Sequence, residues 1–275
     1  MNWLSLSEAA SAVRVRGSDS GRYRLSPAEP AKRITASPEE QLVSLTRPRS
    51  FEAEQYRTLS QVLETRRKSS GQRVVAVSSA GIGDGKTTTT LNLAGALAQS
   101  RDTRVLVIDA DLRCPAVASQ LRLGGPARPG LAGAIRGEAG SLSAAVHRLP
   151  RWNLSVLATG KAEDSPYELL KSDAFGRLIE DARREFEFVL VDCPPLLAVP
   201  DCRVIEPAVD GFLLVVSADT TPRKLVGEAL NVLPPEKVVG IILNRDVSPL
   251  SGYYGYYGRA YGKEIDPPPA SARVS

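Results

Sequence analysis

The glycine-rich segment at residues 80–87, Ala-Gly-Ile-Gly-Asp-Gly-Lys-Thr, has the residue types and spacing to hold a phosphate group. Glycines let the backbone turn tightly with several N–H groups facing one anion, and a helix that begins at the lysine adds positive partial charge. Lys86 would contact terminal phosphates, and the Thr87 hydroxyl would ligate Mg²⁺. The residues predicted to bind a nucleotide here are Gly81, Gly83, Asp84, Gly85, Lys86, Thr87 and Thr88.

One position departs from the usual pattern G-x-x-x-x-G-K-[ST], because Ala80 stands where the first glycine is expected. Alanine is small and fits if its φ is negative. The dinucleotide pattern G-x-G-x-x-G fails, because Lys86 takes the place of its third glycine. A glycine-rich turn without a ligand is the alternative, and the strand-like run before the segment and the helical pattern after it disfavour it.

Carboxylates follow two apolar runs at the points where those runs end. Asp109 and Asp111 follow the first run, and Asp192 ends the second. The carboxyl ends of strands form the ligand crevice of a doubly wound sheet, and Mg²⁺ prefers oxygen ligands. A single aspartate at such a place could equally cap a helix. Together with the phosphate loop, the pattern predicts that the three aspartates converge beside bound phosphate and provide a site suited to Mg²⁺.

A tyrosine cluster occupies residues 251–262, which hold five of the eight tyrosines of the chain: Tyr253, Tyr254, Tyr256, Tyr257 and Tyr261. Glycines at every third position from 252 to 258 disfavour a buried strand or helix. Mobile tyrosines could reach a compact site as phosphate acceptors, and each phosphate would add about −1.5 to −2 charge and so favour dissociation of a complex. A sticky aromatic tail or a base-stacking surface are the alternatives.

The elements that must position these residues alternate along the chain. Apolar runs predict strands at 73–78, 104–108, 154–157, 188–191, 212–216 and 238–243. Helical spacing predicts helices at 51–68, with Ser50 as its cap, and at 86–99, 173–186, 201–209 and 222–233. Continuous apolar strands alternating with helices indicate an α/β fold of the P-loop NTPase type, with a mostly parallel twisted sheet covered by helices on both faces.

The composition divides the chain into four parts. Residues 1–50 are predicted to be a poorly structured arm and residues 51–250 the folded domain. Residues 251–262 form the tyrosine tail, and the proline-rich residues 263–275 are predicted to be disordered.

Composition also excludes several classes of protein. Apolar runs are strand length, far below the ~18 residues of a membrane helix, and the N-terminus lacks a secretory signal, so a cytoplasmic location is expected. The three cysteines are too few and too scattered for a disulfide framework. His147 is the sole histidine, which excludes multi-histidine metal sites, and it is interpreted as an ordinary surface or capping residue. The net charge of +4 gives no reason to expect a nucleic-acid partner.

Taken together, these segments resemble the bacterial tyrosine kinases, or BY-kinases, of capsule and exopolysaccharide export. Residues 80–87, 105–113 and 189–195 match the Walker A, A′ and B motifs of that family in order. The resemblance runs from about residue 51 to 262. Its further matches are 130–131, 135–137, 154–160, 168–170, 200–201, 210–216, 240–244 and the tyrosine tail.

The resemblance implies an ATP- and Mg²⁺-dependent autokinase that phosphorylates its own tyrosine cluster in trans and thereby regulates polysaccharide polymerisation and export. Lys86, Asp109, Asp111 and Asp192 would be its catalytic residues. Asp111 would be the better candidate to orient or deprotonate the tyrosine hydroxyl. Arg113 would help to structure this acidic loop, and Asn244 would lie beside the adenine.

The resemblance also implies partners. A chain without a membrane span is similar to the stand-alone type, which is recruited to the inner face of the membrane by a separate polysaccharide copolymerase, or chain-length determinant protein. A homo-oligomer and a cognate tyrosine phosphatase are expected as well. The family often carries E-x-x-R-x-x-R on its first helix; Glu54 and Arg57 match, but Ser60 replaces the second arginine, so the mode of contact stays open.

Two other functions remain open at this point. The first is an ATPase positioning switch similar to ParA and MinD, which carry a signature lysine where this chain has Gly81. The second is a regulator that binds nucleotide without catalysis and presents its tail to another kinase.

Overall fold

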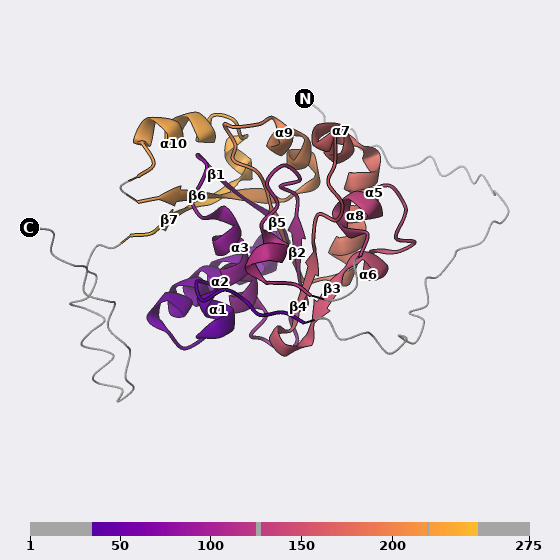
Figure 1. Cartoon of the computed structure of the whole chain (residues 1–275). Coiled ribbons are helices and arrows are strands. Elements are labelled where there is room, and N and C mark those ends of the chain that lie inside the picture. Colours follow the sequence, from indigo (N-terminus) through magenta and orange to yellow (C-terminus); the bar gives the residue numbers. More distant parts are fainter. Residues whose placement is uncertain (1–34, 125–127, 219, 247–275) are drawn as a thin grey trace, which may run out of the picture. The chain divides into compact units, whose positions relative to one another are not determined.

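The computed structural model describes residues 35–124, 128–218 and 220–246. The strands of this part form one seven-stranded sheet in the order β3-β4-β2-β5-β1-β6-β7, and within it only β3 runs antiparallel to its neighbour (Figure 1). The mostly parallel sheet predicted from the sequence is therefore confirmed. The strands are β1 Val74–Ser79, β2 Val105–Asp109, β3 His147–Leu149, β4 Leu154–Leu157, β5 Phe188–Asp192, β6 Gly211–Ser217 and β7 Val238–Asn244.

Helices cover both faces of the sheet, because its strands are apolar on both sides. Val75 and Val77 of β1 pack in one apolar cluster with α1, α2 and α3, whereas Val74 and Ala76 pack in a second cluster with α5 to α10. Figure 1 shows α1 and α2 on the opposite side of the sheet from α5 and α8. The helices are α1 Val43–Thr46, α2 Phe51–Ser70, α3 Lys86–Leu97, α4 Val117–Gln120, α5 Gly130–Ile135, α6 Leu142–Ala145, α7 Pro166–Lys171, α8 Asp173–Glu185, α9 Asp201–Ile205 and α10 Arg223–Leu230, with 3₁₀ turns at Pro150–Trp152, Glu206–Ala208 and Pro235–Lys237.

Local sequence accounts for the ends of α2. The Ser50 hydroxyl accepts a hydrogen bond from the Ala53 N–H at 3.2 Å, as the cap prediction requires. Gly71 ends the helix with φ +75°, a left-handed conformation that glycine adopts without strain.

The three residues of β3 were not predicted as a strand. Their His147 is half-buried on this edge strand, and burial, together with nearby Arg128, lowers its pKa.

Packing on the domain includes residues that were expected to lie outside it. Residues 35–50 were assigned to a poorly structured arm, yet Leu42, Val43 and Leu45 are buried, and Leu42 and Leu45 pack in the apolar cluster on the α3 side of the sheet. The Asn92 side chain of α3 accepts from the Ser44 N–H at 2.9 Å and donates to the Gln41 carbonyl at 3.0 Å. The prediction was wrong for residues 35–50 because three apolar residues decide this segment, not its average composition. Residues 1–34 lie outside the described part of the chain.

None of the helices in the described ranges combines the length and the apolar character that a bilayer crossing requires.

Replacing Leu42 tests whether this segment belongs to the domain. Leu42 is fully buried, so Leu42→Ala is expected to lower the free energy of unfolding by about 2–4 kcal/mol. Urea denaturation followed by circular dichroism measures the loss. Leu243→Ala, at a leucine that is 58% exposed, serves as the control and should cost less than about 0.5 kcal/mol. Equal, small losses in both variants would contradict the packing of residues 35–50 on α3.

Candidate functional site

The phosphate loop lies between β1 and α3, as predicted. Gly83 and Gly85 have φ values of +86° and +92°, which residues with a side chain rarely adopt. A Cβ atom on Gly85 would also lie 2.2 Å from the Asn244 amide nitrogen. Ala80 is not among the described residues with positive φ, so the condition for alanine at this position is met. The chain therefore needs glycine at 83 and 85 but not at 80.

The Asp84 side chain shapes this loop from within. One carboxylate oxygen accepts from the Gly81 N–H at 2.9 Å, and the other accepts from the Thr221 hydroxyl at 2.6 Å. Asn244 donates to the Asp84 carbonyl at 2.9 Å. Both carboxylate oxygens thus bind groups of the protein: one binds within the loop, and the other links the loop to Thr221, which follows β6. The Asp84 carbonyl links the loop to the end of β7. Asp84 was predicted to bind the nucleotide; its side chain would instead affect binding by fixing the conformation of the loop.

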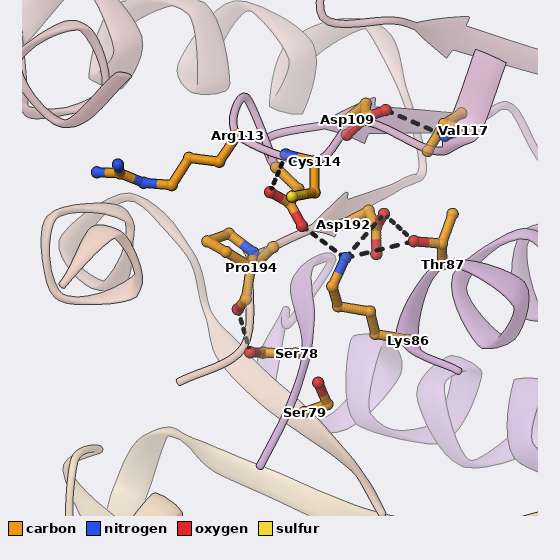
Figure 2. A network of polar contacts seen from close by, with 12 residues as sticks. Ser78, Ser79, Lys86, Thr87, Asp109, Arg113, Cys114, Val117, Asp192 and Pro194 are labelled. Atoms are coloured by element: carbon orange, nitrogen blue, oxygen red, sulfur yellow. Dashed lines mark hydrogen bonds and ion pairs between the residues drawn. The ribbon is translucent and has the colours of Figure 1, made fainter. Parts of the chain in front are cut away.

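Lys86 and the three predicted aspartates meet at one edge of the sheet. Asp109 of β2 pairs in register with Asp192 of β5, and all three carboxylates are buried. The Lys86 ammonium lies 2.7 Å from Asp111 Oδ2 and 3.9 Å from Asp192 Oδ2. The Thr87 hydroxyl donates to Asp192 at 2.6 Å. Figure 2 shows the Lys86 ammonium and the Thr87 hydroxyl beside the Asp192 carboxylate.

Burial sets the electrostatics of this cluster. Asp109 Oδ2 accepts from the Val117 N–H at 3.1 Å, but Asp109 Oδ1 has no hydrogen-bond partner among the described residues. Burial and the neighbouring Asp192 carboxylate raise the pKa of Asp109 to about 8. Burial also raises the pKa of Asp192 to about 6, although Lys86 opposes this shift. Burial lowers the pKa of Lys86, but Asp192 and Asp111 outweigh it, so the net direction is upward.

These side chains fit a bound cation that also touches phosphate. No group of three or more His, Cys, Asp or Glu side chains within the described ranges is arranged to hold a metal ion by itself. Thr87, Asp192 and the unpartnered oxygen of Asp109 nevertheless present oxygen atoms to one small region. Mg²⁺ binds through few protein ligands and completes its shell with water and phosphate oxygens. The chemistry of the donor set is therefore suited to a nucleotide with Mg²⁺.

Residues that the sequence did not identify hold the predicted ones in place. Asp201, fully buried at the start of α9, binds the Arg113 guanidinium at 2.8 and 3.0 Å. Asp111 also accepts from the Cys114 N–H at 3.0 Å, so its loop is fixed on both sides of Arg113. Arg113 thus makes the contact expected of a residue that structures this acidic loop.

Thr88, which was predicted to bind the nucleotide, donates instead to the Gln120 side chain at 3.2 Å.

Of the residues that hold the predicted site residues in place, only some belong to a recognisable sequence motif. Asp201 belongs to the stretch 200–201 that matches the BY-kinases, so the motif could have suggested it. Thr221 carries no such signal, because its contact with Asp84 joins residues 137 positions apart.

Comparison with known proteins gives the class to which this fold and site belong. Residues 75–251 match the CobQ/CobB/MinD/ParA nucleotide binding domain, so the chain is a nucleotide-binding protein of this P-loop class. Within the class, it is 34% identical over 219 residues to the tyrosine-protein kinase YwqD of Bacillus subtilis, covering 79% of this chain and 91% of that protein. The chain therefore belongs to the bacterial tyrosine kinases, and the family expected from its motifs is confirmed.

Two further relatives agree with this assignment. The kinase domain of the Escherichia coli tyrosine kinase ETK superposes with a TM-score of 0.69 at 26% identity, covering 82% of this chain and 87% of that one. The succinoglycan biosynthesis transport protein ExoP of Rhizobium meliloti is 37% identical over 228 residues, which are 78% of this chain but 28% of that protein. The chain thus corresponds to one part of some relatives and to nearly all of others.

The raised pKa of Asp109 predicts how stability depends on pH in the nucleotide-free protein. The folded state keeps the Asp109 proton up to about pH 8, whereas in the unfolded chain an aspartate with the ordinary pKa of 3.8 has already released it. The free energy of unfolding therefore falls as the pH rises between these two values. Asp109→Asn should remove this loss. We expect the difference between the melting temperature of the variant and that of wild type to increase in favour of the variant by at least about 3 °C from pH 5 to pH 8.

Calorimetry in the same buffers measures this difference. Asp181→Asn, at an exposed residue of α8, is the control and should follow the wild-type pH profile. If Asp109→Asn also follows the wild-type profile, the buried Asp109 carboxyl does not hold a proton in this range.

Proposed function

We propose that this chain is an ATP-dependent tyrosine autokinase that uses Mg²⁺ and phosphorylates tyrosines at residues 251–262 of a second copy. The observation that carries the proposal is the buried cluster in which Lys86 lies 2.7 Å from Asp111, directly beside a loop that fits phosphates. The tyrosine kinases among its relatives support it. The acceptor tyrosines themselves lie outside the described residues.

In this proposal, the loop N–H groups and Lys86 bind the phosphates. Thr87 and Asp192, with Asp109 beside them, would hold the cation. Bound Mg²⁺ would neutralise charge on the phosphates, which is the main requirement of phosphoryl transfer. Lys86 and Asp111 form an ion pair in the structure, so engagement of Lys86 with phosphate frees Asp111 Oδ2.

Asp111 then serves the acceptor. Its freed oxygen accepts the proton of the tyrosine hydroxyl. The tyrosine oxygen forms a bond to the γ-phosphorus as the bond from this phosphorus to the β-phosphate oxygen breaks, leaving ADP. Arg113 and Asp201 keep the Asp111 loop in position through their ion pair. Catalysis comes mainly from positioning and from neutralised charge.

The cellular role follows from the relatives and is proposed with the activity. ExoP is by name a transport protein of succinoglycan biosynthesis, which supports a role in exopolysaccharide or capsule polymerisation and export. A separate membrane polysaccharide copolymerase would recruit the chain from the cytoplasm to the inner face of the membrane. A cognate phosphatase would reverse the modification, and we propose no nucleic-acid partner.

A homo-oligomer would bring the tail of one copy to the site of another. Glu54 and Arg57 form an ion pair with each other on α2, and Arg57 also donates to the Gln99 side chain at 2.8 Å. Ser60 is buried and donates to the Arg57 carbonyl at 2.8 Å, so its position faces the domain interior. An oligomer of this chain would therefore use a contact without a cation at position 60.

Loss of the lysine tests the activity directly. Lys86→Met should lower phosphotyrosine formation with Mg-ATP by at least about a hundredfold, because one preorganised charge contact to the transferred group is lost. Immunodetection of phosphotyrosine on purified protein measures it. Lys224→Met, at an 88% exposed side chain on α10, is the matched control and should label as wild type does. Equal labelling of Lys86→Met would contradict the kinase.

On wild-type protein, phosphotyrosine formation, ATP hydrolysis and nucleotide binding together distinguish the kinase from the two alternatives, a positioning ATPase and a non-catalytic regulator. ATP hydrolysis without labelling would indicate a positioning ATPase, and nucleotide binding with neither reaction would indicate a regulator.

The acceptors are tested by replacing the five tail tyrosines, Tyr253, Tyr254, Tyr256, Tyr257 and Tyr261, with phenylalanine. Most of the label should disappear, because phenylalanine keeps the ring but has no hydroxyl to accept the phosphoryl group. Nucleotide affinity, measured by calorimetry, should remain that of wild type. Tyr56 and Tyr167 are the tyrosines of the described residues, and Tyr167→Phe should keep the full signal. A full signal in the fivefold variant would place the acceptors elsewhere.

A further inference from the structure

Two exposed aliphatic side chains border the charged cluster. The large apolar residues that are exposed within the described ranges are Val62, Ile82, Leu197, Ile241 and Leu243. Ile82 lies in the phosphate loop and is 88% exposed, and Leu197 lies in the segment that follows β5 and is 37% exposed. Neither residue is needed to complete the core, and both stand at the edge of the sheet that holds Lys86 and Asp111.

The loop conformation keeps Ile82 in solvent. On one side of it, the Gly81 N–H donates to the buried Asp84 carboxylate at 2.9 Å, and the Gly81 carbonyl accepts from the Ser79 hydroxyl at 2.7 Å. On the other side, Gly83 has a left-handed conformation. Residue 82 is therefore fixed at both neighbours, and its side chain stays exposed beside the phosphate-binding backbone.

Leu197 is brought to the same place by the segment after Asp192. The Leu196 N–H donates to the Ser79 carbonyl at 2.9 Å, and the Pro194 carbonyl accepts from the Ser78 hydroxyl at 2.6 Å. This segment is thus joined to the end of β1, where the phosphate loop begins. Leu196 is buried by these contacts, and Leu197 is left exposed. Figure 2 shows the Pro194 carbonyl beside the Ser78 hydroxyl, which donates to it.

We propose that Ile82 and Leu197 form the apolar surface on which the ring of the acceptor tyrosine, from residues 251–262 of a second copy, packs during transfer. The inference rests on the proposed function and adds how that site recognises its acceptor. A tyrosine has an apolar ring and a polar tip, so its hydroxyl can meet Asp111 only if the ring is accommodated nearby. The cluster itself offers charged and polar groups, and these two residues supply apolar contact.

The chain itself supports this occupant. The described residues end at Asp246, and 29 more residues follow, with five tyrosines among the first sixteen of them. Glycines flank these tyrosines at 252, 255, 258 and 262, so each ring has small neighbours that do not obstruct its approach to a surface.

A trans-phosphorylation assay tests the inference. The enzyme is the full chain with its five tail tyrosines replaced by serine, so that its own tail does not compete. The acceptor is the full-length Lys86→Met protein, which keeps its tail. Initial rates of phosphotyrosine formation over a range of acceptor concentrations give the KM for the acceptor, and a second titration gives the KM for ATP.

Leu197→Ser and Ile82→Ser in the enzyme should each raise the KM for the acceptor about tenfold, which corresponds to about 1.4 kcal/mol. The KM for ATP should change less than twofold, a split that a merely distorted loop would not produce. Ile82→Leu should restore the acceptor KM. Val62→Ser, at a 47% exposed valine of α2, is the matched control and should behave as the unmodified enzyme.

The outcomes separate this inference from the function on which it rests. Unchanged acceptor KM in both serine variants, or equal changes in the KM for ATP, would overturn the ring-binding surface while leaving the kinase in place. Labelling of wild type alone, with none of the Lys86→Met acceptor, would exclude a second copy as its occupant. Absence of any phosphotyrosine in wild type would overturn the proposed function itself.

Discussion

Three buried carboxylates share one lysine at the carboxyl edge of this sheet, and much of the rest of the structure serves to keep them there. Carboxylates placed so close in the interior would repel one another and lose hydration, which is costly unless they are paired or protonated. Lys86 offsets part of this cost through Asp111 and Asp192, while Asp109 is left with an unpartnered oxygen and a pKa of about 8. The site is thus poised to take up positive charge.

Rigid surroundings make this arrangement possible. β1, β2 and β5 are adjacent and apolar on both faces, so their carboxyl ends are fixed by packing above and below the sheet. Asp84 fastens the phosphate loop to the end of β6, and Asp201 fastens the Asp111 loop through Arg113. Each of these supports is a buried carboxylate with its hydrogen bonds satisfied, which is how a protein holds functional groups in an otherwise unfavourable position.

The fold could largely be predicted because its strands are local patterns. Short runs of valine, isoleucine and leucine are buried on both faces, and the helices between them have apolar faces of their own, so the alternation indicates a parallel sheet. β3 was missed because a three-residue strand carries almost no pattern. The segment at residues 35–50 was misjudged because Leu42 and its neighbours are a small apolar group within a polar, proline-containing stretch, and burial on α3 decides their structure.

By itself, the sequence determined the types of groups that meet: a glycine loop, a lysine, a threonine and carboxylates, each next to the end of a strand or the start of a helix. These relations are local, and parallel strands necessarily bring their carboxyl ends to one edge. Only the tertiary structure decided which carboxylate pairs with Lys86, that Asp84 faces Thr221, and that Ile82 and Leu197 are left exposed. Such contacts join residues up to 137 positions apart, and their partners are chosen by packing and desolvation, which no local pattern encodes.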